Sequence, residues 1–269
     1  MLLILAILPA AAGEFPWLEQ VPVRRLAELP TPTGYTRVAV EPGSFAAWLR
    51  ALPLLPGRPP VHLFDGRLKS NQQAHHAVVQ IDVGTRDLQQ CADAVMRLRA
   101  EYLWAADRRD EIRFNFTSGH PARWRDWRLG RRPLVSGSRV EWQQRAADDD
   151  GYANFRAYLD RVFTYAGTAS LVGELARVEP ATDVRAGDLF IQGGHPGHAV
   201  LVLDVAENER GERVFLLGQS YMPAQQFHVL RQPGGEDPWY PARASGGLRT
   251  PEWSFDHGDL RRFKNGSGS

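Results

Sequence analysis

The sequence predicts an α+β fold in which an antiparallel sheet packs against an N-terminal core helix. The core helix is expected from Leu88 to about Ala106, where apolar residues recur at three-to-four spacing. A run of short strands with turn-like connections follows in the C-terminal half, which is typical of α+β domains. Because no later segment has the composition of an interdomain linker, we expect 61–264 to form a single domain.

Composition argues against two classes of partner. The chain has 269 residues, and its 32 Lys and Arg nearly balance its 31 Asp and Glu. This balance leaves no electrostatic footprint for nucleic acid, and no apolar stretch approaches the ~20 residues that span a bilayer. We therefore expect no nucleic-acid partner and no transmembrane segment. Only Lys69 and Lys264 are lysines, so arginine carries nearly all of the positive charge.

The N-terminus is typical of an export signal. Residues 1–12 are apolar and end in small residues, and Ala10 and Ala12 offer an Ala-x-Ala cleavage site before Gly13. This pattern predicts a periplasmic or secreted protein, and a buried strand is the alternative for the same residues. At the other end, 265–269 consists mostly of Gly and Ser and predicts a flexible tail or linker.

The elements before the core helix are expected to be short. Residues 13–60 are rich in proline and predict an N-terminal arm over the domain, with one short helix at 44–52. A pair of strands is expected next, at 61–64 and 74–83, because apolar and polar residues alternate there.

The core helix is expected to begin at a capping box made by Asp87 and Gln90. Two further helices are expected at 152–163 and 168–178. Apolar strands joined by turn-like segments complete the predicted sheet, at 188–192, 198–205, 213–219 and 227–230.

No motif for phosphate binding or metal hydrolysis is present. The sequence lacks a P-loop, a Gly-x-Gly-x-x-Gly after a strand and a His-Glu-x-x-His, and it lacks the Gly-x-Ser-x-Gly elbow of serine hydrolases. His195, His198 and His228 leave a metal-dependent hydrolase as the weakest of three functional hypotheses. We assign no metal ligand and expect no cofactor.

The single cysteine is the strongest candidate for chemistry. Cys91 lies in the first turn of the core helix, where the helix dipole favours a thiolate and free backbone N–H groups can receive an oxyanion. His198, the first polar side chain of an apolar strand, is the expected base. Gln219 ends the paired strand, so its amide is expected to lie beside His198 and orient the imidazole.

A purely structural role for Cys91 is the alternative. The residue also lies on the apolar stripe of its helix, and free cysteines are among the most buried residues in proteins. An exported chain with one leftover thiol favours a functional role, because an oxidising compartment makes such a thiol a liability.

Five stretches carry a family resemblance. They are Asp87–Val95, Gly187–Gly194, Pro196–Val200, Gln219–Gln225 and Thr250–Trp253. Together they resemble a bacterial family catalogued as domain of unknown function 4846 (DUF4846). The resemblance covers roughly 60–263, and it implies no assigned activity.

A more distant resemblance implies a function. Gly187-Asp188-Leu189-Phe190, followed by a strand that begins with histidine, is similar to the core of the NlpC-type cell-wall peptidases. These are papain-like cysteine hydrolases, and the similarity implies Cys91 as nucleophile, His198 as base and Gln219 as orienting group. It further implies that Gly187 and Asp188 are structural, that 107–180 is an insertion, and that peptides of peptidoglycan are the substrates.

The leading hypothesis is therefore an exported thiol amidase or peptidase with a papain-like core. Gln90, Ser220 and Tyr221, which adjoin the nucleophile and Gln219 in the sequence, are the expected substrate-binding residues. The main alternative is an envelope protein that keeps the papain-like scaffold and binds glycan or peptide without turnover.

Overall fold

The computed structural model describes residues 15–18 and 24–264. The predicted signal peptide at 1–12 and the predicted tail at 265–269 lie outside the described residues. Within them, helices and antiparallel sheets confirm the predicted α+β class. None of the described helices combines the length and the apolar character needed to cross a membrane.

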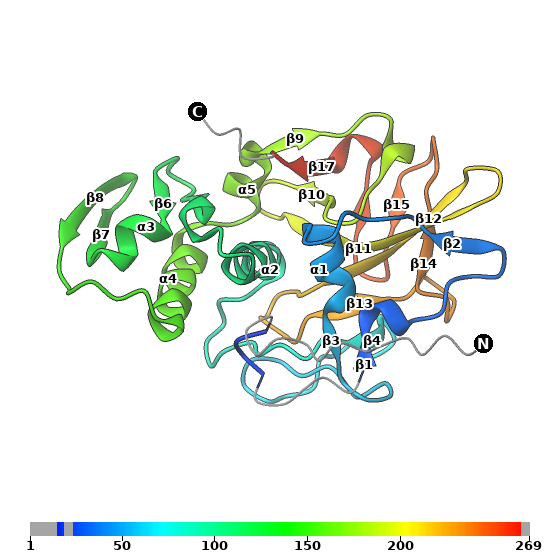
Figure 1. The fold of residues 1–269 in the computed structure, drawn as a ribbon, viewed down its shortest axis with the longest axis horizontal. Helices are drawn as coiled ribbons and strands as arrows, with labels where there is room; N and C mark the ends of the chain where they lie inside the picture. Colours follow the sequence, from blue (N-terminus) through cyan, green and yellow to red (C-terminus); the bar gives the residue numbers. More distant parts are fainter. Residues whose placement is uncertain (1–14, 19–23, 265–269) are drawn as a thin grey trace, which may run out of the picture.

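A nine-stranded antiparallel sheet forms the body of the molecule (Figure 1). Its main path runs β4-β13-β12-β11-β10-β17-β9, with β14 beside β12 and β2 beside β11. The strands are β2 (Tyr35–Arg37), β4 (His75–Val78), β9 (Leu175–Arg177), β10 (Leu189–Gln192), β11 (His198–Asn208), β12 (Arg213–Gln219), β13 (His228–Leu230), β14 (Trp239–Pro241) and β17 (Leu260–Phe263).

The described residues also form four two-stranded sheets and five α-helices. The pairs are β1 (Arg24–Arg25) with β3 (Pro53–Leu54), β5 (Arg113–Asn115) with β6 (Pro121–Arg123), β7 (Arg131–Ser136) with β8 (Arg139–Gln144), and β15 (Leu248–Arg249) with β16 (Ser254–Phe255). The α-helices are α1 (Phe45–Ala51), α2 (Cys91–Ala105), α3 (Trp124–Arg128), α4 (Tyr152–Tyr165) and α5 (Thr168–Glu174). Short 3-10 turns are η1 (Leu26–Glu28), η2 (Arg109–Glu111), η3 (Ala181–Asp183) and η4 (His257–Asp259).

The core helix α2 begins at Cys91, three residues later than predicted. Its cap is Gln90, whose backbone N–H donates to Asp93 Oδ2 at 3.1 Å. The predicted cap at Asp87 is wrong, because that carboxylate is used elsewhere: Oδ1 accepts the backbone N–H of Ala224 at 2.7 Å. Cys91 is therefore the first helical residue, at the positive end of the helix dipole.

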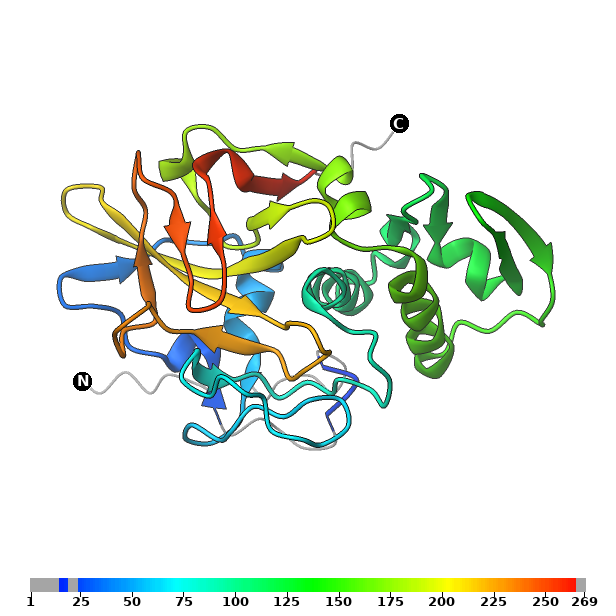
Figure 2. The same ribbon diagram turned by 180° about the vertical axis from the view of Figure 1, so that it is seen from behind.

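Helix α2 is buried on nearly all sides, whereas the sequence predicted one apolar face. One side packs on β11 of the sheet, and the other meets a lobe built from β5 to β8, α3 and α4 (Figures 1 and 2). At the lobe, Trp104 stacks on Phe155 with ring centroids 4.5 Å apart. The fully buried Arg97 forms ion pairs with Asp82 and Glu101, which compensates its charge inside the protein.

The lobe adds a group of aromatic side chains to the apolar cluster that it shares with α2 and the sheet. It occupies the segment 109–165 inside the predicted insertion, at the left of Figure 1. Trp124 and Trp127 are buried, and Arg132 lies over the Trp127 ring at 3.9 Å. Both tryptophans therefore pack inside the lobe.

Strand β11 separates two apolar clusters. Ala199, Leu201 and Leu203 belong to the cluster on the α2 side, whereas Val200 and Val202 belong to the cluster on the opposite face. This alternation follows from the two-residue repeat of a strand. Side chains buried on both faces explain the nearly continuous apolar run of β11.

The N-terminal segment is part of the body of the fold. Strand β2 pairs with β11, and α1 buries Phe45, Trp48 and Leu49. Arg37 and Arg50 each bind the buried carboxylate of Asp204 at 2.6 Å. The helix predicted at 44–52 is confirmed.

The strand predicted at 61–64 does not form. His62 and Leu63 make only single bridges, to Leu68 and Gln225, and β4 pairs with β13 instead. The segment folds back on itself because the Gln72 side-chain amide bonds the backbone of Val61 at both N–H and C=O.

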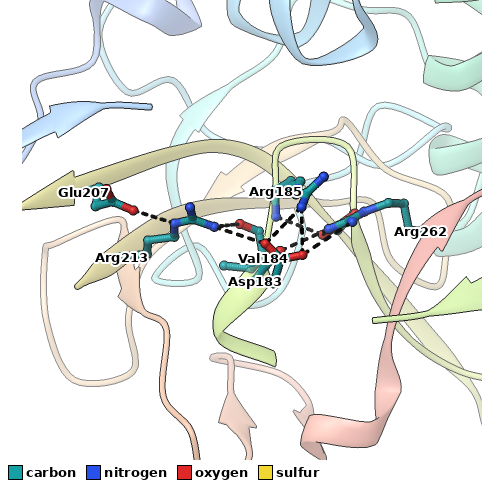
Figure 3. A network of polar contacts seen from close by, with 7 residues as sticks. Asp183, Val184, Arg185, Glu207, Arg213 and Arg262 are labelled. Atoms are coloured by element: carbon teal, nitrogen blue, oxygen red, sulfur yellow. Dashed lines mark hydrogen bonds and ion pairs between the residues drawn. The ribbon is translucent and has the colours of Figure 1, made fainter. Parts of the chain in front are cut away.

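Asp188 anchors the start of β10 beside a network of arginines around Asp183 (Figure 3). Its buried carboxylate accepts two hydrogen bonds from Arg262, at 2.6 and 2.8 Å, and one from the backbone of Arg185 at 2.8 Å. Neighbouring Asp183 forms ion pairs with Arg185, Arg213 and Arg262. Gly187 adopts φ +94°, which favours glycine, at the turn that leads into β10.

Candidate functional site

The candidate site is centred on the ends of β11 and β12. His198 begins β11 and Gln219 ends β12, and the register pairs Leu201 with Gly218. His198 Nε2 lies 2.8 Å from Gln219 Oε1, and both side chains are buried. The contact predicted between these two residues is confirmed, because the hairpin brings the two strand ends together. Their catalytic roles stay predictions.

The thiol of Cys91 approaches the same strand end from the α2 side. The backbone N–H of Ala199, the residue after His198, faces the sulfur and favours its charged form. No hydrogen bond joins Cys91 Sγ to the His198 ring among the described contacts. The reason is the strand alternation: Ala199 points toward α2, so His198 points toward the opposite face.

Burial keeps both groups neutral at physiological pH. It raises the pKa of the Cys91 thiol to about 11, with the Asp93 charge as a second cause. Burial also lowers the pKa of His198 to about 4, against the hydrogen bond to Gln219, which raises it. The resting pair is therefore a thiol and a neutral imidazole, and the ion pair of an activated thiolate is not formed.

Two charged residues that the sequence reasoning missed extend the site. Glu252 Oε2 accepts a hydrogen bond from Gln219 Nε2 at 2.7 Å, and Glu252 Oε1 forms an ion pair with Lys69. Lys69 is only 5% exposed. A series of polar contacts thus connects the imidazole of His198, through Gln219 and Glu252, to the buried ammonium group of Lys69. The composition could have drawn attention to Lys69, since it is one of two lysines among the 32 Lys and Arg residues.

Aromatic rings enclose the imidazole of His198. Tyr221 lies edge-on at 4.7 Å between ring centroids, Trp253 lies at 5.3 Å and Phe255 at 5.9 Å. Burial raises the pKa of the Tyr221 phenol, and the negative charges of Glu252 and of an ionised Cys91 raise it further, which places Tyr221 near Cys91 as well. The half-buried rings of Tyr221 and Trp253 are therefore the groups that a ligand of this site would meet.

The three predicted substrate-binding residues differ in their surroundings. Ser220 is fully buried, and its hydroxyl contacts the carbonyls of Gln89 and Gln225 at 3.0 and 2.8 Å. It therefore holds two segments together and does not face a cleft. Gln90 caps α2, with its amide bonded to Asp87, and only Tyr221 contacts the His198 ring.

The five stretches that carried the family resemblance converge here. Asp87 binds the backbone of Ala224, and Ser220 binds that of Gln89. The Trp253 indole N–H donates to Gln192 Oε1 at 3.0 Å. Segments far apart in the sequence are therefore tied together around His198.

Comparison with known proteins now identifies the family. A family model described as domain of unknown function (4846), DUF4846, matches residues 26–262. The chain belongs to the DUF4846 family. The match includes every residue of the candidate site, from Lys69 to Phe255. No curated protein matches the chain, and no solved structure matches it.

The histidines of this DUF4846 protein do not gather into a metal site. Among the described residues, no three His, Cys, Asp or Glu side chains lie where they could hold one ion. His198 Nε2 is bonded to Gln219, and His228 Nδ1 contacts the carbonyl of Gln226 at 2.9 Å. The metal-dependent hydrolase built on His195, His198 and His228 therefore lacks the cluster it requires.

A cavity lies elsewhere in this DUF4846 structure. A cavity of about 830 Å³ is lined by Trp48, Tyr102 and Trp104 at the C-terminal end of α2. Cys91 stands at the opposite end of the same helix, where its side chain keeps 8% exposure. Access to the thiol is thus narrow in this structure.

Proposed function

We propose that this DUF4846 protein is an exported cysteine hydrolase that cleaves peptide or amide bonds of the bacterial cell wall. The observation that carries the proposal is the hydrogen bond of 2.8 Å between His198 Nε2 and Gln219 Oε1, at the strand end where α2 delivers Cys91. A helix-borne thiol, an imidazole and an orienting amide are the groups of a papain-like triad. The antiparallel neighbours β10, β11 and β12 support a papain-like arrangement of these groups.

In the proposed reaction, Cys91 Sγ attacks the carbonyl carbon of the scissile amide while His198 Nδ1 takes the thiol proton. The backbone N–H groups of Cys91 and Ala92 already lie near the sulfur and would stabilise the oxyanion. The imidazolium then gives its proton to the departing amine, which leaves a thioester on Cys91. Water attacks the thioester and gives a proton to His198, which returns it to the sulfur.

His198 and Cys91 lie toward opposite faces of β11 in this structure, so the transfer requires the imidazole and the thiol to turn toward each other at the strand end when substrate binds. Catalytic contacts commonly tighten only in the substrate complex. Among the described residues, Nδ1 of His198 has no hydrogen-bond partner, so it is available as an acceptor. The neutral state of both groups fits general-base catalysis, in which the proton leaves as the sulfur attacks.

The substrate class rests on the resemblance to NlpC-type peptidases and on the export signal that the sequence predicts at 1–12. Exposed apolar side chains adjoin the site in the sequence: Leu68, beside Lys69, is 59% exposed, and Met222, beside Tyr221, is 53% exposed. Such residues are suited to contact an extended peptide.

The first experiment measures the alkylation rate of Cys91 by iodoacetamide against pH, in the wild type and in His198→Ala. At pH 7 we expect the wild type to react at least about tenfold faster, because the imidazole assists proton removal. The two rates should converge as the pH approaches the thiol pKa of about 11. Equal rates at pH 7 would remove His198 as the base.

The second experiment tests turnover on peptidoglycan fragments. The wild type should release new amines, and Cys91→Ala should lose at least about 100-fold in rate. Lys264→Met serves as a control, since Lys264 is exposed, its charge acts on Glu174 of α5, and no described contact joins it to Cys91, His198 or Gln219. Fragments that remain intact with fully alkylatable enzyme would contradict the substrate class and leave the thiol chemistry standing.

An envelope binding protein without turnover is the second candidate. It is favoured by the burial of Cys91, which raises the thiol pKa to about 11. This candidate predicts saturable binding of wall fragments with no new amines, and equal affinity for the wild type and Cys91→Ala. A loss of alkylation in His198→Ala would argue against it.

A further inference from the structure

We infer that the acceptor oxygen of Glu252, held in place by the buried ammonium group of Lys69, decides which nitrogen of His198 carries the proton. Glu252 and Lys69 would thus act as positioning residues, through the amide of Gln219. Four side chains connect the ammonium group to the imidazole, each within hydrogen-bond distance of the next. This inference rests on the proposed function. It concerns the same site as the proposed function, and it deepens that proposal by naming what prepares the base.

The first step is the orientation of Glu252. An ammonium group has only donors and a carboxylate only acceptors. Lys69 is 5% exposed and Glu252 is 12% exposed, so each charge is compensated chiefly by the other. Glu252 Oε1 accepts from Lys69, which leaves Oε2 as an acceptor that faces Gln219.

The second step is the orientation of the Gln219 amide. Its nitrogen must face Glu252, because the opposite orientation would place two acceptor oxygens 2.7 Å apart inside the protein. His228 favours the same orientation. His228 Nδ1 donates to the Gln226 carbonyl, so Nε2 is an acceptor, and it lies 3.5 Å from Gln219 Nε2. Two acceptors therefore hold the nitrogen on one side.

The third step fixes the tautomer. With its nitrogen held by Glu252, Gln219 can offer only Oε1 to His198. His198 Nε2 must then carry the proton, since an oxygen acceptor needs a donor. The lone pair is left on Nδ1, the nitrogen that has no partner among the described residues. The opposite tautomer would present an N–H where the mechanism needs a base.

The position of Lys69 is itself determined by the fold. Its backbone N–H donates to the Val61 carbonyl, and its own carbonyl accepts from the Gln72 amide. The Gln72 side chain also bonds both backbone groups of Val61. This closed turn delivers the ammonium group to Glu252 and to within 5.3 Å of the Tyr221 ring centroid.

The test reads the tautomer directly, by long-range ¹H–¹⁵N correlation NMR of the full chain labelled with ¹⁵N-histidine. His198 is assigned by its loss in His198→Gln. We expect the wild type to show the Nε2–H form. An Nδ1–H form in the wild type would overturn the inference without any variant. This result can be distinguished from failure of the hydrolase proposal, because that proposal is tested by the alkylation of Cys91 and by the release of amines.

Two double variants test the cause. Lys69→Met/Glu252→Gln removes both charges but keeps an amide oxygen that can accept from Gln219, so the Nε2–H form should remain. Lys69→Met/Glu252→Leu removes that acceptor and leaves the amide held only by the longer 3.5 Å contact with His228 Nε2, so a population of the Nδ1–H form should appear. Alkylation of Cys91 at pH 7 should then be at least about tenfold slower in the second variant than in the first. The same tautomer and the same rate in both variants would overturn the inference, and Lys264→Met controls for loss of a lysine.

Discussion

Cys91 and Asp93 share the first turn of α2, and each is protonated at neutral pH because of burial. Burial raises the pKa of the Asp93 carboxyl to about 8, and the ionised form of Asp93 raises the pKa of Cys91 further. Asp93 Oδ2 accepts the backbone N–H of Gln90, while Oδ1 is buried without a partner among the described residues. The helix dipole favours an anion at this helix start, but the low polarity of the surroundings favours the neutral forms of both groups.

Replacement of Asp93 should change how stability depends on pH. The folded-state pKa is raised, so Asp93 stabilises the fold at low pH and costs stability as pH rises through the range between its unfolded and folded values. Asp93→Asn should therefore gain stability relative to the wild type from pH 5 to pH 8, by about 3 kcal/mol. Urea unfolding at several pH values measures the difference. A constant difference across that range would contradict the assignment.

His228 should reduce the stability of the fold as pH falls, whereas Asp93 reduces it as pH rises. Burial lowers its pKa to about 3, so the unfolded state binds the proton first and stability is lost as pH falls below the unfolded value of about 6.5. His228→Asn keeps a donor for the Gln226 carbonyl but does not titrate. Between pH 6.5 and 4 it should lose about 3 kcal/mol less stability than the wild type. Acid unfolding of both proteins in parallel tests this, and identical acid sensitivity would refute it.

Loss of the amide at Gln219 should affect the fold and the site together. Gln219→Met keeps the shape but leaves the imidazole N–H of His198 and a carboxylate oxygen of Glu252 without partners. We expect a loss of about 1–3 kcal/mol in unfolding free energy and a fall of at least about tenfold in alkylation of Cys91 at pH 7. Unchanged alkylation in a folded variant would show that the amide does not prepare the base.

The glycine before Gln219 should not accept a side chain. A Cβ at Gly218 would lie 2.5 Å from the Phe227 ring and 2.7 Å from Leu203. Gly218→Ala should therefore destabilise the protein by about 1–3 kcal/mol. Gly173→Ala in α5 is the matched control, because nothing lies within 4 Å of its Cβ position. The control should be neutral or stabilising by up to about 1 kcal/mol in thermal unfolding.

Much of the local structure could be predicted because local rules govern it. The strand at 213–219 and the contact of His198 with Gln219 follow from apolar patterning and one short hairpin turn. The start of α2 could not be predicted, because Asp87 is a good cap that is diverted to Ala224, more than a hundred residues away. The burial of α2 on both sides depends on the lobe, which no periodicity within the helix reveals.

The sequence by itself determined the α+β class, the main helices, the β10–β11–β12 meander and the pair His198–Gln219. These depend on residue spacing, which a chain carries along its length. Only the tertiary structure brought Lys69 and Glu252 to that pair, and only it decided that the Cys91 thiol is buried and neutral at rest. The physical reason is that a pKa and a hydrogen-bond partner depend on the surroundings of a group, and those surroundings come from segments far apart in the sequence.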